Sequence, residues 1–227
     1  MIKAVFFDLY ETLITEWANG ERKATHSIEQ LGIPEDVFKE EWNIRVEKRM
    51  DGTFESYQCV LIDILQTLKM PIDDHVLTLI ESERIKAKAI AFENIEKHII
   101  DTLSHLKKMS IKIGLISNCT PEEITAWESS KLADFFDDVI FSFQAKCAKP
   151  SPEIYLTACR NLKVEPKDAI FVGDGGSNEL EGASRVGIKA YHATWFQPEW
   201  LVKEKNLGFP QLKHPMELIE KEISYEK

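Results

Sequence analysis

Two carboxylates and one hydroxyl stand where short apolar runs of this chain end. Asp8 closes the run from residue 3, Ser117 closes residues 112–117, and Asp174 closes the run from residue 169. Runs of this kind are typical of strands buried on both faces of a parallel sheet. Such sheets bind ligands outside the carboxyl ends of their strands. If the three strands are parallel neighbours, these side chains converge on one crevice, with two carboxylates available as a nucleophile and a metal ligand.

The second half of the chain predicts the sheet that would hold these residues. Helical and strand-like segments alternate after residue 93, and Pro121 is expected to open a helix that runs to Lys131. The other predicted segments are helices at 94–109, 152–162, 178–186 and 216–222, and strands at 112–117, 139–142, 169–174 and 189–192. This alternation is typical of an α/β fold with a Rossmann-like three-layer parallel sheet core and right-handed crossovers.

A long helical stretch separates the first predicted strand from the second. Its predicted helices cover residues 21–31, 35–49 and 54–68, and a fourth follows Asp74 and ends at Ala91. A single crossover needs far fewer residues. We therefore expect an inserted α-helical cap domain at residues 15–92 and a core formed by residues 1–14 and 93–227. The cap would act as a lid, with candidate specificity residues Trp42, Arg45, Arg49 and Tyr57.

Composition narrows the class of partner. The chain has 227 residues, 44% of them hydrophobic, and a formal net charge of -10, which argues against nucleic acid or an anionic membrane surface as the main partner. No apolar run approaches the roughly 20 residues of a membrane helix, and the first residues lack a signal-peptide pattern. The four cysteines lack metal-site spacing. We expect a cytoplasmic monomer or homodimer that binds a small anionic molecule.

Four ordered motifs resemble those of the haloacid dehalogenase superfamily. They are Asp8-Leu9-Tyr10-Glu11-Thr12-Leu13, Ser117-Asn118, Lys149-Pro150, and Gly173-Asp174 followed by Glu179 and Gly182-Ala183. Each motif alone is also compatible with a turn or a helix cap. The four in order cover most of the chain, and three of them lie at predicted strand ends. The resemblance implies a hydrolase that works through a covalent intermediate.

The resemblance also assigns roles to individual residues. Asp8 matches the nucleophile, and a carboxylate that forms a covalent intermediate splits one hard displacement into two easier ones. Thr12 and Ser117 would hold the transferred group through their hydroxyls, and Asn118 would orient it with its amide. Lys149 would balance the negative charge on nucleophile and substrate.

A magnesium site is part of the same implication. Mg²⁺ takes oxygen ligands in an octahedron and usually keeps several waters. The carboxylates of Asp8 and Asp174 and the main-chain carbonyl of Tyr10 would suffice as protein ligands. Glu179 stands where the family commonly has a second Asp, and would bind the ion through water or orient Asp174.

Tyr10 departs from the phosphatase pattern. Family phosphatases carry an Asp at this position, two residues after the nucleophile, which protonates the leaving group. A phenol with a pKa near 10 is a poor substitute at neutral pH. Tyr10 instead resembles the branch that hydrolyses 2-haloacids, in which halide leaves without a proton. That branch usually has no metal and a Ser at the place of Asp174, and for its substrate-binding Arg this chain offers only Arg45 as the nearest candidate. Glu11, where the family usually has Gly, is a second departure.

Three hypotheses follow. The favoured one is a Mg²⁺-dependent phosphatase that acts on a small phosphorylated metabolite through an aspartyl-phosphate intermediate. The second is a metal-independent 2-haloacid dehalogenase with an aspartyl-ester intermediate, which Tyr10 favours. The third is a non-catalytic binding protein with the same fold, against which the retained Asp8, Lys149 and Asp174 argue.

Overall fold

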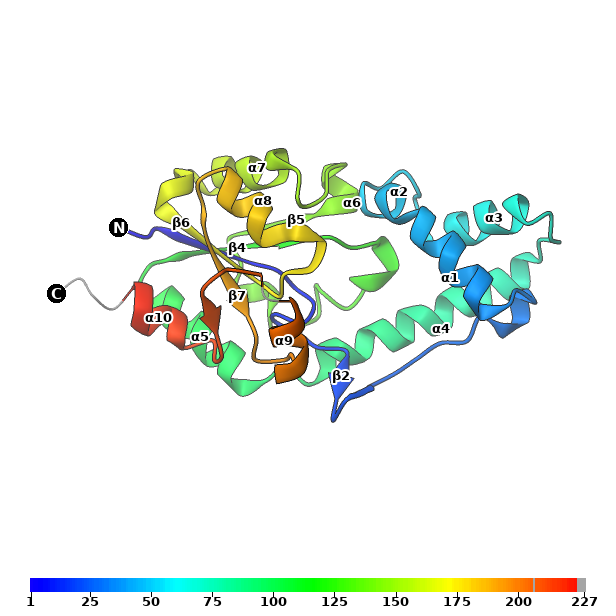
Figure 1. Ribbon diagram of the computed structural model, residues 1–227, viewed down its shortest axis with the longest axis horizontal. Helices are drawn as coiled ribbons and strands as arrows, with labels where there is room; N and C mark the ends of the chain where they lie inside the picture. The colour runs from blue at the N-terminus through cyan, green and yellow to red at the C-terminus, as the bar shows by residue number, and fades with distance from the viewer. Residues whose placement is uncertain (206, 224–227) are drawn as a thin grey trace.

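The structure is a computed structural model that describes residues 1–205 and 207–223 (Figure 1). Within these residues a six-stranded sheet has the order β5-β4-β1-β6-β7-β8, and every neighbouring pair is parallel. The strands are β1 (Ala4–Phe7), β4 (Lys112–Ser117), β5 (Asp138–Phe141), β6 (Ala169–Gly173), β7 (Lys189–Ala193) and β8 (Gln211–Leu212). Strand β1 lies between β4 and β6, which confirms that the three strands with site-like ends are parallel neighbours.

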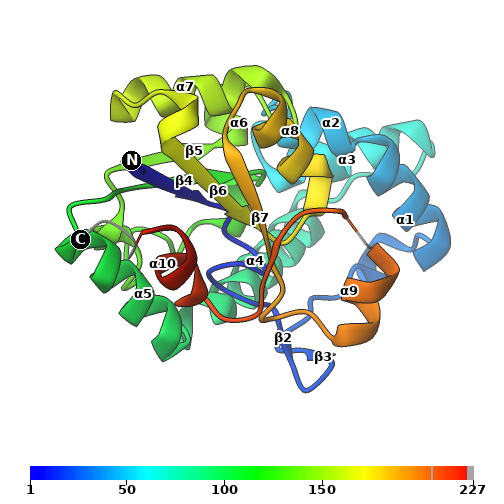
Figure 2. The same cartoon turned by 60° about the vertical axis from the view of Figure 1, so that its left-hand side comes forward.

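Helices cover both faces of the sheet, as Figures 1 and 2 show. Helices α5 (Lys97–Lys108) and α10 (Glu217–Glu222) pack on one face, and α7 (Pro152–Leu162) and α8 (Glu179–Arg185) pack on the other. Successive strand residues point to opposite faces, so Val5 and Phe7 enter the first core and Ala4 and Phe6 enter the second. The predicted three-layer α/β architecture is confirmed.

Helix α7 shows how the sequence determines one of these layers. Pro152 occupies the first helical position, where its fixed φ suits the helix and its missing N–H has no intrahelical partner to lose. Ile154, Ala158 and Leu162 recur every four residues and are buried against the sheet. The predicted range 152–162 is therefore correct. The turn before this helix carries Lys149 into the site.

A second group of helices lies between β1 and β4 in the sequence. They are α1 (Glu35–Ile44), α2 (Val46–Met50), α3 (Tyr57–Thr67) and α4 (Asp74–Glu93). Figure 1 shows α1, α2 and α3 beyond one end of the sheet, with α4 leading back to it. Their buried apolar residues, among them Leu61, Ile64, Leu77 and Ile80, form a hydrophobic cluster of their own. The boundaries of a cap domain at residues 15 and 92 stay a prediction.

Two predicted helices are wrong. Residues 21–31 form part of an antiparallel hairpin, β2 (Trp17–Ala18) and β3 (Glu21–Arg22), and a 3₁₀ turn, η1 (Glu29–Leu31). Asn19 and Gly20 have φ of 54° and 84°, which is the two-residue turn that suits a hairpin. The predicted helix at 121–131 ends as η2 (Pro121–Glu123), because tertiary packing that buries Trp127 overrides helical propensity.

Several short elements complete the described chain. Helix α9 (Glu199–Lys205) and strand β8 were not predicted from the sequence. The others are α6 (Ser142–Ala145), η3 (Ala133–Phe135), η4 (Pro166–Asp168) and η5 (Gly176–Asn178). In the part of the chain that the structure describes, no helix combines the length and apolarity needed to cross a membrane.

Candidate active site

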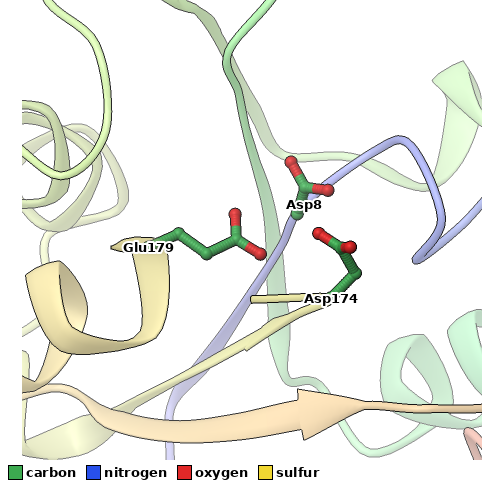
Figure 3. Close-up of side chains that lie close together, drawn as sticks. All are labelled: Asp8, Asp174 and Glu179. Carbon is green, nitrogen blue, oxygen red and sulfur yellow. The ribbon is translucent and has the colours of Figure 1, made fainter. Parts of the chain in front are cut away.

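The carboxyl ends of β4, β1 and β6 bring the predicted acidic residues together. Asp8 and Asp174 directly follow β1 and β6, Ser117 is the last residue of β4, and Glu179 is the first residue of α8. Asp8, Asp174 and Glu179 each present a carboxylate oxygen within 4.8 Å of the others. Figure 3 shows the three side chains directed toward one another from different elements.

Lys149 connects two of these carboxylates. Its Nζ donates to Asp8 Oδ1 at 2.5 Å and also to Glu179 Oε2. The side chain is buried, and burial opposes its charge, but the carboxylates of Asp8 and Glu179 raise the pKa of Lys149 above its ordinary value. The lysine therefore remains a cation at neutral pH, beside the predicted nucleophile.

Asn118 fixes the backbone that carries this lysine. Its Nδ2 donates to the carbonyl of Lys149 at 2.9 Å, and its Oδ1 accepts from the Lys149 N–H at 2.8 Å. The two bonds tie the end of β4 to the turn before α7. The structure thus places the Asn118 amide on the main chain of Lys149, whereas the sequence led us to expect it against the substrate.

The carboxylate cluster has an excess of negative charge. Burial raises the pKa of Asp8. The Lys149 cation opposes this shift, and the Asp174 carboxylate adds to it. Burial also raises the pKa of Glu179 to about 8, and the Asp8 carboxylate adds to this shift while Lys149 opposes it. Lys149 contacts Asp8 and Glu179, and Lys205 Nζ lies 3.4 Å from Asp174 Oδ2, so two lysines face three carboxylates. A set of buried and half-buried oxygen ligands with this charge fits a hard divalent cation.

A buried hydroxyl lies at the end of the neighbouring strand. Ser117 Oγ is buried and has no hydrogen-bond partner among the described residues. Thr12 Oγ1 lies 3.5 Å from Asp8 Oδ2. A buried polar atom without a partner costs about 1 to 3 kcal/mol, and an oxygen of a bound ligand would satisfy it. Ser117 is therefore available to a ligand held at the strand ends.

Tyr10 is anchored away from a proton-transfer role. Its hydroxyl donates to the carbonyl of Glu123 at 2.7 Å, and its ring packs edge-on against Phe92. Burial raises the pKa of Tyr10, and the Glu123 and Glu16 carboxylates reinforce the shift. The side chain is a neutral phenol at neutral pH, with its hydroxyl proton committed to a carbonyl. Its own carbonyl stays a predicted metal ligand.

Glu11 closes the turn after the nucleophile. Its φ of 56° lies in the left-handed region that glycine adopts most easily, which explains why a glycine suits this position. The Glu11 carboxylate accepts from Thr15 Oγ1 at 2.6 Å and from the Glu16 N–H at 3.0 Å. These bonds hold the turn without a glycine.

Three residues at the site were missed by sequence reasoning. Gln197 Nε2 donates to the carbonyl of Asp174 at 2.8 Å and to its Oδ2 at 3.0 Å. Lys205 Nζ lies 3.4 Å from the same Oδ2, and Trp195 Nε1 donates to the carbonyl of Thr12 at 2.9 Å. All three follow the last motif, and no spacing in the sequence distinguishes them from ordinary surface residues.

The four candidate specificity residues divide into two groups: Arg45 and Arg49 contact other residues of the helical segment, whereas Trp42 and Tyr57 line a cavity. Arg45 forms ion pairs with Glu41 of α1 and Asp63 of α3, so its guanidinium joins these two helices. Arg49 lies 3.7 Å from the centre of the Trp42 ring, and its Nε is buried without a hydrogen-bond partner among the described residues. A cavity of about 280 Å³ is lined by Glu16, Arg22, His26, Trp42, Tyr57, Arg84 and Lys88, together with Ala24, Thr25, Phe38 and Ala87.

An ion-pair network joins α4 to the loop after β4. Arg84 donates to Glu122 Oε1 at 2.8 Å and to Glu123 Oε1 at 2.9 Å. Lys88 Nζ lies 2.9 Å from Glu123 and 2.9 Å from Glu16. Burial would raise the pKa of Glu123, but Lys88 and Arg84 lower it to about 2. The network fixes the helical segment beside Tyr10, whose hydroxyl is bonded to Glu123.

The family model of the haloacid dehalogenase-like hydrolases matches residues 2–187. The chain belongs to this family. A glyceraldehyde 3-phosphate phosphatase of Methanopyrus kandleri is 28% identical to this hydrolase over 196 residues, which are 83% of the chain and 82% of the relative.

Solved structures confirm the fold of this hydrolase. A 2-haloacid dehalogenase from Pseudomonas syringae pv. Tomato DC3000 has a TM-score of 0.67 at 21% identity, covering 97% of each chain. A wild-type family enzyme from Bacteroides thetaiotaomicron, in complex with magnesium and inorganic phosphate, has a TM-score of 0.56 at 20% identity, covering 85% of this chain and 94% of that one.

Proposed function

We propose that the protein is a Mg²⁺-dependent phosphatase that acts on a small phosphorylated metabolite through a phosphoryl group on Asp8. The proposal depends most on the carboxylate of Asp174, which lies beside those of Asp8 and Glu179. The dehalogenase pattern has a Ser at the position of Asp174, and a Ser would not supply this carboxylate. The phosphatase relative and the magnesium–phosphate complex of a family enzyme support the same assignment.

The proposed reaction begins at Asp8. One carboxylate oxygen attacks phosphorus and a new P–O bond forms. The bond to the leaving oxygen breaks, and that oxygen departs as an anion that takes a proton from water. The Ser117 hydroxyl, which has no partner among the described residues, donates to a phosphoryl oxygen. Lys149 remains charged and compensates the negative charge that gathers on Asp8 and the phosphoryl group. Water then attacks phosphorus, which releases phosphate and restores the carboxylate.

The proposed metal ligands are the carboxylates of Asp8 and Asp174 and the carbonyl of Tyr10. Mg²⁺ bound there would draw the phosphoryl oxygens toward Asp8 and offset their charge. Glu179 already accepts from the Gly175 N–H at 3.0 Å and pairs with Lys149. We therefore assign Glu179 the second of the two roles that the sequence allowed, orienting Asp174, which it would do through the neighbouring Gly175 N–H.

Tyr10 favours a second candidate function, that of a 2-haloacid dehalogenase. The Tyr10 hydroxyl is bonded to the Glu123 carbonyl, so it gives no proton to a leaving group, and a halide needs none. A halide would leave carbon while Asp8 forms an ester. The pairing of Arg45 with Glu41 and Asp63 weighs against this function, because the guanidinium is not free for a substrate carboxylate.

One assay separates the two functions. Purified protein is tested with Mg²⁺ and with chelator for phosphate release from an aryl phosphate and for halide release from a 2-haloacid. We expect phosphate release that requires Mg²⁺. Halide release that persists in chelator, without phosphate release, would replace the proposal with the dehalogenase.

The proposal also includes a cap over the site, a cellular compartment and an oligomeric state. Residues 15–92 would serve as the cap over a small anionic substrate, with Trp42 and Tyr57 at the cavity beside α4. The protein would act in the cytoplasm as a monomer or homodimer. Its net charge of -10 supports a small molecule rather than nucleic acid as partner.

A further inference from the structure

Trp195 and Gln197, which follow the four motifs in the sequence, contact the loops that carry Asp8 and Asp174. Trp195 donates to the carbonyl of Thr12 in the loop after β1, and Gln197 donates to Asp174 in the loop after β6. The family match ends at residue 187, so these contacts lie outside the part of the chain that identifies the family. We infer that His192 and Gln197 are positioning residues that fix the Asp174 carboxylate for cation binding.

The Gln197 amide makes bonds on both of its sides. Its Nε2 donates twice to Asp174, at 2.8 Å to the carbonyl and at 3.0 Å to Oδ2. Its Oε1 lies 3.2 Å from Nε2 of His192. His192 is buried in β7 and is the register partner of Gly173, the residue before Asp174. The imidazole, the amide and the carboxylate therefore form a continuous chain across two neighbouring strands.

This chain limits the rotation of the Asp174 side chain. Oδ1 accepts from the Gly176 N–H at 3.0 Å, and Oδ2 accepts from Gln197. A carboxylate offers about four lone-pair positions, so these two donors and Lys205 Nζ, 3.4 Å from Oδ2, orient it and still leave a position for a cation. Gln197 is neutral, so it orients the carboxylate without cancelling its charge. The Lys205 ammonium, in contrast, would compete with a cation for the same Oδ2.

His192 sets which way the amide faces. Gln197 can present Nε2 to Asp174 only while its oxygen faces away, and the group on that side is Nε2 of the buried imidazole. When Nε2 of His192 carries the ring proton, it donates to the Gln197 amide oxygen. In the reversed amide, the Gln197 NH₂ group would face this donor, and the two donors would repel each other. Residues that contact a metal ligand directly, as Gln197 does here, typically change metal affinity by about 10- to 100-fold.

The test measures Mg²⁺ affinity without substrate, by titration calorimetry of the full chain. Gln197→Met keeps the length of the side chain and removes the donor to Asp174. The matched control is Gln66→Met, at an exposed glutamine of α3. We expect the Mg²⁺ dissociation constant to rise about 10- to 100-fold in Gln197→Met and to stay at the wild-type value in Gln66→Met.

A second pair of variants gives an independent measurement on His192. His192→Leu removes the donor to the Gln197 amide and should weaken Mg²⁺ binding, whereas His192→Gln restores an N–H donor and should recover most of the affinity. A structural role alone would not produce this rescue. His192→Leu should also add little to Gln197→Met, because both changes break the same chain of contacts.

The inference rests on the proposed Mg²⁺ site, and the outcomes keep the two apart. Wild-type protein that binds Mg²⁺ while Gln197→Met and His192→Leu bind it equally well would overturn the positioning role and leave the phosphatase proposal intact. Wild-type protein that binds no Mg²⁺ would overturn the metal site and this inference with it.

Discussion

At the scale of single residues, the site depends on charge held out of water. Lys149 contacts Asp8 and Glu179 together, and Asp174 lies within reach of both carboxylates. Each of these positions was predictable from the sequence, because each follows a short apolar run or a recognisable motif. The Asn118 and Gln197 contacts were not, because no pattern in the sequence shows that the Asn118 amide faces the main chain of Lys149 or that Gln197 returns to Asp174.

The first prediction at this scale concerns the Tyr10 hydroxyl. It is bonded to the Glu123 carbonyl, so Tyr10→Phe should leave phosphate turnover within a few-fold of wild type while slightly lowering stability. A loss approaching the roughly 10²- to 10⁴-fold that general acid catalysis contributes would show that the hydroxyl takes part in proton transfer. Steady-state rates on an aryl and an alkyl phosphate provide the measurement.

A second prediction follows for the same position. Tyr10→Asp supplies the carboxylic acid that family phosphatases carry there, so turnover of an alkyl phosphate, whose leaving group needs a proton, should rise. An aryl phosphate should change less, because its leaving group departs more easily unprotonated. Tyr10→Phe is the control for loss of the phenol. No rise on the alkyl substrate in folded Tyr10→Asp protein would contradict a site built for phosphoryl transfer.

At the scale of elements, the joint between α4 and η2 is electrostatic. Arg84 pairs with Glu122 and Glu123, and the side chains of Arg84 and Glu122 are 9% and 2% exposed. Removing one partner of a buried pair costs about 3 to 5 kcal/mol, because it leaves the other charge unpaired. Arg84→Met should therefore lower the free energy of unfolding by about that amount in urea denaturation.

The control for Arg84 is an exposed pair in the same chain. Arg160 and Glu153 lie 2.6 Å apart on α7, with side chains 60% and 61% exposed, and exposed pairs contribute little to stability because water screens their attraction. Arg160→Met should change stability far less than Arg84→Met. Equal effects would mean that the α4 network contributes no more than a surface ion pair.

The same network predicts a pH dependence. Lys88 and Arg84 overcome the effect of burial and lower the pKa of Glu123 from its usual 4.5 to about 2. A depressed carboxyl pKa stabilises the fold above the unfolded-state value, and this stabilisation is lost as pH falls from about 4.5 toward about 2. Urea unfolding at pH 5 and pH 3 should show a smaller loss in Glu123→Gln than in wild type; an equal loss would assign the acid sensitivity to other groups.

The elements also show where sequence reasoning stopped. Periodicity located α7 at its observed bounds and placed β4 and β6, because their apolar faces pack on the sheet or within it. It failed at the hairpin β2–β3, whose two-residue strands are exposed and carry no apolar alternation. It also failed at residues 124–131, where the packing of Trp127 against Phe136 and Phe141 decides the path of the chain.

At the scale of the whole molecule, the order of the strands creates the site. With β1 between β4 and β6, the ends of three strands distant in sequence meet at one edge of the sheet, and the turn before α7 and the start of α8 bring Lys149 and Glu179 to it. The helical segment between β1 and β4 attaches beside this edge through the Arg84 network. The arrangement gathers three carboxylates and Lys149 at this edge, so a bound divalent cation would add the positive charge that a phosphorylated substrate needs.

The most direct test of the central claim is the initial rate of phosphate release from an aryl phosphate by wild type and Asp8→Asn. The amide keeps the shape of the carboxylate but cannot attack phosphorus. With Mg²⁺ present, wild-type protein should release phosphate, and folded Asp8→Asn protein should release none above background. Wild-type turnover should also stop in chelator. Phosphate release at the wild-type rate by folded Asp8→Asn protein would contradict the account.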